Sequence, residues 1–150
     1  MKTVWDVQVR EELVNRITSL KENSPALWGK MSVNQMLTHG ALWDEMVLRN
    51  KHFKRPLIGI LLGRMFLKKE LKDESPMRHN NPTVPDLIVK EAAADVASLK
   101  NRWITLVNEY GAYSLPDHSF VHPFFGKMTR AQVGYFAYKH IDHHLRQFGS

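Results

Sequence analysis

Apolar residues recur every three or four positions along most of the chain, which is the spacing of an amphipathic α-helix. The first such run predicts a helix from about residue 6 to residue 22, with Leu13 and Ile17 on its apolar face. A second run predicts a helix over 32–49, because its first serine stands three residues before Gln35, as in a capping box. The first third of the chain is therefore predicted to form two amphipathic helices.

Three further helices are predicted in the rest of the chain. Pro56 opens a short and very apolar segment that ends near residue 71. A third long helix is expected from Thr83 to about residue 110, with Pro85 near its first turn, and a fourth from Thr129 to about residue 148. Little of the chain has the alternation of a strand. These elements predict an all-α fold: one four-helix-bundle domain over 1–150, with an extra short apolar helix after the second helix.

Composition narrows the chemistry that such a bundle can carry. The 150 residues have a mass of 17.4 kDa and are 43% hydrophobic, which suits one domain with a real core. The absence of cysteine excludes disulfides, thiolate nucleophiles and cysteine-based metal sites, so imidazole and oxygen would have to hold any metal. The N-terminus lacks the apolar run of a signal peptide, and no stretch approaches the roughly 20 apolar residues of a membrane span. We expect a cytoplasmic protein.

Lysine and arginine outnumber aspartate and glutamate by 21 to 15, which gives a net charge of +6 and a pI near 9.7. Such a charge attracts nucleic acid, phospholipid or a small anion and does not choose among them. Basic residues such as Lys30, Lys100 and Lys127 are spread over loops and helix surfaces, and the chain lacks an arginine-dense recognition helix or an aromatic RNA-binding pattern. We therefore expect a small-molecule substrate, no specific nucleic-acid partner and no membrane partner.

Histidines on two of the predicted helices point to a metal site. His140 and His144 stand four residues apart, so they project from one face of the last helix. That helix and the second one begin with similar sequences, 126–132 and 29–35, which share Gly-Lys-Met and a closing Gln. Measured from these starts, His39 and His140 differ by four positions and should have similar rotational phase, about one turn apart. The spacing predicts that the three imidazoles meet at one point.

Residues near this point are expected to wall or support it. On a helix Phe136 and Gln147 share the face of His140, whereas Asp142 points away from it. Asp44 is also badly placed, so no general base accompanies the ligands. His143 is assigned to the rim of the site. The expected pocket and supporting residues are Met36, Trp43, His122, Phe136, His143 and Gln147. An aromatic stripe of this kind also suits plain core packing, and the loop around His122 suits a simple packed connection.

The combination of motifs resembles the DinB-like superfamily over essentially the whole chain, and more narrowly a branch of unknown function. The motifs are Met31-Ser32-x-x-Gln35-Met36-Leu37 before His39, then His122-Pro-Phe-Phe-Gly126-Lys-Met-Thr129, and finally His140-x-x-His143-His144-x-x-Gln147. The resemblance implies a four-helix bundle, often dimeric, with a divalent metal held by the histidines matching His39, His140 and His144. Relatives include metal-dependent hydrolases and enzymes that transfer low-molecular-weight thiols to electrophiles.

Three neutral imidazoles leave at least one coordination position open, as in catalytic rather than structural sites. The opening could activate water for hydrolysis or bind a substrate thiolate, so a hydrolase or a thiol S-transferase is expected. Zn or Ni is the favoured metal, and Fe or Mn is possible, since imidazole suits several divalent ions. The alternative is a non-catalytic basic helical binding module with structural histidines.

The apolar segment 56–71 suggests an assembly surface. It contains Gly59 and Gly63, four residues apart, which permit close helix contact. Its apolar content exceeds what a small bundle needs to close one end, so we expect it to support a homodimer. A membrane surface is the weaker alternative, and the lysines and arginines around the segment are interpreted as a solvated rim.

Overall fold

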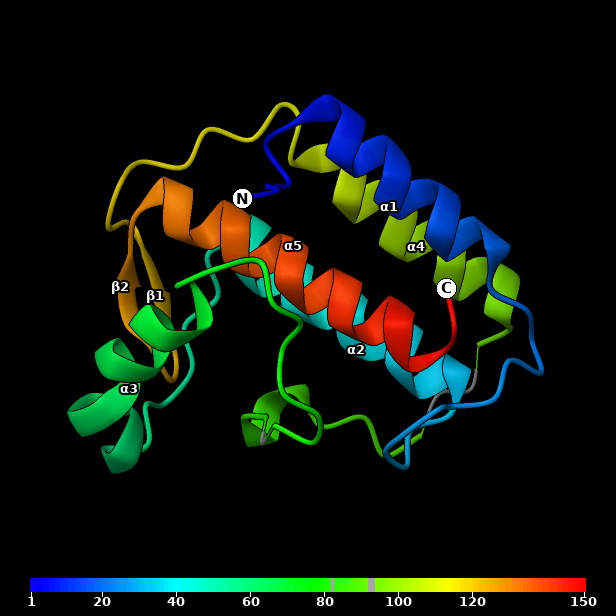
Figure 1. Ribbon diagram of the computed structural model, residues 1–150, viewed down its shortest axis with the longest axis horizontal. Coiled ribbons are helices and arrows are strands. Elements are labelled where there is room, and N and C mark those ends of the chain that lie inside the picture. The colour runs from blue at the N-terminus through cyan, green and yellow to red at the C-terminus, as the bar shows by residue number, and fades with distance from the viewer. Residues whose placement is uncertain (82, 92–93) are drawn as a thin grey trace.

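The computed structural model describes residues 1–81, 83–91 and 94–150 (Figure 1). In these residues five α-helices are formed: α1 (Val7–Ser19), α2 (Val33–Leu48), α3 (Leu57–Glu70), α4 (Val96–Glu109) and α5 (Arg130–Gln147). A 3-10 turn, η1 (Pro85–Leu87), precedes α4, and the strands β1 (Phe120–His122) and β2 (Gly126–Met128) precede α5. The prediction of a mainly helical fold is confirmed, and the small strand pair is the departure from it.

Four of the helices enclose the apolar core. α1 packs against α4 and α5, and α2 packs against the same two helices from the other side. Figure 1 shows α2 and α5 side by side through the centre, with α1 and α4 as a second pair and α3 lying with the strands at the opposite end. The largest fully buried side chains include Leu13, Ile17, Met36, Met46, Trp103, Ile141 and Leu145. The predicted apolar faces of α1 and α2 are therefore the faces that the core uses.

The two helices that carry the histidine cluster begin in the same way. Ser32 and Thr129 each accept a hydrogen bond from the backbone N–H three residues later, and the glutamine there bonds back to the cap. Three residues before each cap is a glycine with positive φ, Gly29 at 78° and Gly126 at 80°. The repeated sequence thus specifies one local geometry twice, as its capping pattern predicts.

The third long helix was expected to begin at Thr83, and this start is wrong. α4 begins at Val96, where the side chain of Asp95 accepts a hydrogen bond from Ser98 N. Pro85 opens a 3-10 turn instead, and Ile88 after it is extended and exposed. Residues 92–93 of the expected helix lie outside the described residues.

Side chains of α2 explain why this segment is not helical. Nδ1 of His39 donates to the carbonyl oxygen of Leu87 at 2.9 Å. The amide of Gln35 donates to the carbonyl oxygens of Val89 and Lys90 at 3.3 and 3.1 Å. These carbonyls are therefore bound to α2 and do not accept the bonds that a helix would require.

The connection before α5 was expected to be an irregular loop, and it forms a hairpin. The strands pair antiparallel, with Phe120 opposite Met128 and His122 opposite Gly126. Nδ1 of His122 accepts hydrogen bonds from the backbone N–H groups of Phe124 and Phe125 at 3.1 and 3.2 Å. The buried imidazole therefore stabilises the turn between the strands.

α3 rests on this hairpin through its two glycines. A Cβ atom at Gly59 or Gly63 would lie 2.8 or 2.1 Å from the carbonyl oxygen of Phe124. Buried Lys139 of α5 donates to the carbonyl oxygens of Glu70 and Asp73, which fixes the end of the helix. The close contact that the glycine spacing predicts is therefore made with the chain's own hairpin.

The contact between α2 and α4 is built around a buried carboxyl group. Asp44 is 0% exposed and accepts hydrogen bonds from Nε1 of Trp103 at 2.7 Å and from the hydroxyl of Tyr110 at 2.8 Å. The Trp103 ring lies over Gly40, where a Cβ atom would be 2.4 Å from ring carbon Cζ2. The absence of a side chain at Gly40 therefore lets the indole approach close enough to reach Asp44.

Gly40→Ala is expected to destabilise the protein by about 1–3 kcal/mol, because the added methyl group must displace a fully buried indole. Urea unfolding measures the loss. Gly111→Ala is the matched control, since its Cβ atom would mainly meet the end of the Arg10 side chain at 2.8 Å, with the carbonyl oxygen of Asn108 at 3.3 Å, rather than a buried ring. Equal midpoints for the two variants would contradict the proposed packing constraint.

Candidate metal centre

The structure brings His39 of α2 together with His140 and His144 of α5. One ring nitrogen from each of the three lies within 4.8 Å of the other two. The residues are 5, 7 and 7% exposed, so the cluster is inside the protein with little access to solvent. The predicted phase relation between the two helices therefore places these imidazoles at one point.

Two of the histidines are oriented by hydrogen bonds at their outer nitrogens. His39 donates from Nδ1 to the carbonyl of Leu87, and His144 Nδ1 lies 3.0 Å from Oε1 of Gln147. The amide nitrogen of Gln147 donates to the carbonyl of Trp28 at 2.8 Å, which leaves its oxygen to accept from His144. Because Nδ1 carries the proton in both rings, Nε2 keeps a free lone pair. This arrangement orients the ligands in many metal–histidine sites.

The inner nitrogens have a spacing that suits a shared cation. Nε2 of His39 lies 3.2 Å from Nε2 of His140. Two nitrogens bound to one tetrahedral zinc ion at about 2.0–2.1 Å stand about 3.3 Å apart. In the described part of the chain, Nδ1 of His140 is buried without a hydrogen-bond partner. His140 is therefore held by packing and by its hydrogen bond to Nε2 of His39, whereas the other two rings are also fixed at their outer nitrogens.

Burial keeps the three imidazoles neutral. It lowers the pKa of His39, which the bond to Leu87 partly offsets, and it lowers the pKa of His140 well below the usual range. The pKa of His144 falls to about 3, first through burial and then through the neighbouring histidines. Neutral rings are the form that binds a metal, so the site is ready for one at neutral pH.

Aromatic side chains form one wall of the cluster. Trp43 stacks on His140 with ring centroids 4.8 Å apart, and Phe136 lies 6.4 Å from the same ring. His122 of the hairpin packs on Phe136 at 5.7 Å. Met36 is fully buried on α2, three residues before His39. The expected lining residues are thus near the cluster, although His122 is also engaged in holding its turn.

His143 lies beside the cluster and is not one of the three convergent residues. Its ring is 5.1 Å from that of His144, and it faces Trp28 at 5.7 Å and His79 at 6.2 Å. Trp28 and His79 stack on each other at 3.8 Å. Sequence reasoning missed these two residues because they come from loops, where no helical spacing relates them to the ligands.

The nearby carboxylates are bound elsewhere. Asp142 accepts hydrogen bonds from Arg16 and Arg146, each at 2.7 Å, on the side of α5 away from the cluster. Asp44 faces α4. Within the described residues the group that could hold a metal consists of the three histidines alone. The centre would thus carry the charge of its metal without a carboxylate to offset it.

The fold and the cluster define a helical protein with a buried three-histidine centre. The chain belongs to the family described as a protein of unknown function (DUF1569), whose model matches residues 5–150. No curated protein and no solved structure matches the chain. The family description gives no activity, and the likeness to the DinB-like superfamily stays a prediction.

Asp44 should make stability depend on pH. Burial raises its pKa from 3.8 to about 7, against the lowering effect of its bonds to Tyr110 and Trp103. A raised native pKa stabilises the fold fully below the unfolded value and loses that contribution as pH rises through 7. Between pH 4 and 7 the unfolding free energy of the metal-free protein should fall, relative to Asp44→Asn, by up to about 1.4 kcal/mol per pH unit. Parallel urea-unfolding profiles would contradict this.

Gln147 should tune metal affinity without touching the metal. Gln147→Leu removes the acceptor for His144 and should weaken binding by about 10- to 100-fold in a chelator competition assay. Gln147→Glu keeps an acceptor oxygen and should bind more tightly than the leucine variant. Equal losses in both variants would show that the contact with Trp28 matters instead.

Proposed function

We propose that the protein is a metal-dependent enzyme in which His39, His140 and His144 hold one divalent cation. The observation that carries this proposal is the pairing of Nδ1 with an oxygen acceptor in two of the rings while their Nε2 atoms turn inward. Ordinary core histidines have no need for convergent lone pairs. The packing of α1, α2, α4 and α5 around one core also supports a four-helix bundle of DinB-like type.

The ligand set favours a centre that accepts an anionic ligand. Three neutral imidazoles leave the positive charge of the cation uncompensated and at least one coordination position open. When bound, a divalent ion supplies a Lewis acid that stabilises a thiolate or lowers the pKa of water. Zn or Ni suits the imidazoles best, with Fe or Mn as further candidates.

Transfer of a low-molecular-weight thiol to an electrophile is the reaction that we favour over hydrolysis. Attack by water gains from a general base, and the carboxylates of Asp44 and Asp142 are bound away from the cluster. A thiol, whose ordinary pKa is near 8.5, needs less help to reach its anionic form. The rings of Trp43 and Phe136 offer an apolar wall for the electrophile.

Metal analysis tests the proposal at its base. The purified protein should take up about one equivalent of Zn or Ni, and His140→Ala should lose most of it because one of three ligands is removed. His143→Ala is the matched control, since this neighbouring buried histidine lies outside the convergent group. A wild-type protein that binds no divalent metal would favour the basic binding module with structural histidines.

Activity is tested by pairing thiols with electrophiles. Metal-loaded protein should accelerate loss of the free thiol, and His144→Ala should abolish the acceleration. Turnover of esters or amides with no thiol present would move the assignment to a hydrolase. Tight nucleic-acid binding that survives His144→Ala would contradict both enzyme classes.

A further inference from the structure

α3 exposes an unusually apolar surface. Leu57 is 78% exposed, Leu61 80% and Met65 60%, and these residues follow one another at intervals of four on one side of the helix. The exposed large apolar residues of the helix are Leu57, Ile58, Ile60, Leu61, Leu62, Met65 and Phe66. A contiguous patch of this kind marks an interaction surface more often than isolated exposed residues do.

α3 is apolar both on the side that packs against the hairpin and on the side that faces solvent. Gly59, Gly63 and Leu67 form the buried side, which meets the hairpin at Phe124. Leu61 lies on the opposite side and points away from the protein. Phe66 also packs on Phe124 of the hairpin. Leu57, Leu61 and Met65 stay more than half exposed, although the inner side of the helix is already anchored.

The charge of the protein is concentrated around the same helix. Residues 51–72 contain seven lysines and arginines and one glutamate, a net charge of +6, which equals the net charge of the whole chain. The remaining residues hold 14 basic and 14 acidic side chains and are neutral together. Individual lysines are spread over the surface, as the sequence indicates, while the net positive charge belongs to this segment, in which Lys51 is paired with Glu45 of α2.

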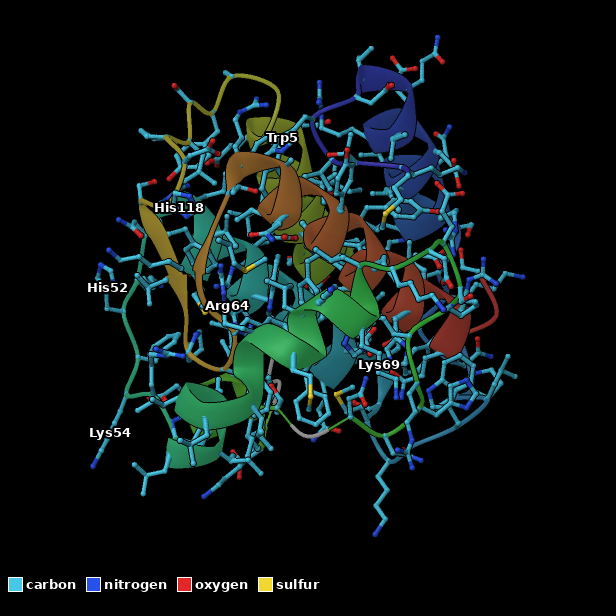
Figure 2. All side chains as sticks on the ribbon, turned by 60° about the vertical axis from the view of Figure 1, so that its left-hand side comes forward. Trp5, His52, Lys54, Arg64, Lys69 and His118 are labelled. Carbon is cyan, nitrogen blue, oxygen red and sulfur yellow. The ribbon has the colours of Figure 1, made fainter. Side chains whose placement is uncertain are left out.

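Basic and apolar groups are interleaved at this surface. Figure 2 shows Lys54, Arg64 and Lys69 around α3 and the connection before it. A shallow hollow at the end of the helix is lined by Met65, Lys68, Lys69, Leu71 and Lys72. Lysine stems can lie along apolar surface while their ammonium groups reach outward to anionic groups.

We propose that residues 51–72 form a docking surface for an anionic membrane leaflet, with α3 lying in the plane of the interface. Leu57, Leu61 and Met65 would enter the acyl boundary, and the surrounding cations would meet the lipid phosphates and carboxylates. None of the described helices is long and apolar enough to cross a membrane. The proposed surface binding departs from the expectation of no membrane partner.

Charge argues against a second copy of the chain as the occupant. A two-fold dimer brings the same patch of each subunit together, so the +6 of one segment 51–72 would face the +6 of another. An anionic leaflet offers the opposite charge together with an apolar interior. A single partner, the anionic leaflet, would thus bind both the exposed apolar residues of α3 and the cations around them.

Vesicle co-sedimentation of the full chain, with its metal content measured in parallel, tests the proposal. Binding to vesicles with about 30% phosphatidylserine should exceed binding to pure phosphatidylcholine by at least about tenfold and should weaken in about 0.5 M salt. Leu61→Asp with Met65→Asp should reduce binding by at least about tenfold. Lys68→Glu with Lys69→Glu should do the same through charge alone.

Val7→Asp is the matched control, because Val7 is 56% exposed on α1, a helix that lies apart from α3 (Figure 1). It should leave vesicle binding unchanged, and none of these variants should alter metal content, so the result is independent of the proposed enzyme. Two outcomes would overturn the proposal. One is no preference for anionic vesicles. The other is a wild-type protein that does not bind vesicles but forms a dimer in light scattering, together with a Leu61→Asp variant that is monomeric.

Discussion

The cluster depends on one interaction that His39 and His144 share and His140 lacks: a hydrogen bond at the outer nitrogen of a buried imidazole fixes the ring so that its inner nitrogen can serve a ligand. His39 makes this bond with the carbonyl of Leu87 and His144 with the side chain of Gln147. The first bond, together with those from Gln35 to Val89 and Lys90, holds the segment 85–90 on α2. The second ties the end of α5 to the loop at Trp28. Two irregular segments, residues 85–90 and the loop at Trp28, are thus positioned by hydrogen bonds that also orient His39 and His144.

The helices and the convergence of the three histidines could be predicted from the sequence because both follow from local periodicity. Spacing of four places His140 and His144 on one face, and the matching caps set the phase of His39. The start of α4 could not be predicted in this way, since the carbonyl of Leu87 is claimed by a residue 48 positions earlier. The hairpin could not be predicted because its strands have only three residues each, too few to show the alternation typical of a strand.

The structure separates two buried polar environments along α2. His39 faces α5 and joins a group of neutral rings, whereas Asp44 faces α4 and is satisfied by an indole and a phenol. Both side chains are buried in the same core, but Asp44 does not bond to His39: its partners are Trp103 and Tyr110, whereas those of His39 are Leu87 and His140. This separation leaves the histidine cluster without a carboxylate, and for that reason the proposed reaction uses an anionic substrate group rather than base-assisted attack by water.

Because the cap at Thr129 fixes where α5 begins, the number of residues from Thr129 to His140 sets the direction in which the histidines of α5 point. One residue inserted between them would turn both histidines of α5 by about 100° and shift them by about 1.5 Å along the axis. The cap and the backbone hydrogen bonds of the helix would stay intact, but the buried residues after the insertion, Ile141 and Leu145 among them, would rotate out of the core. The histidine cluster would be lost, because the side of α5 that faces His39 would then carry residues other than His140 and His144. The ten residues between the cap and His140 therefore determine the cluster as much as the histidines themselves do.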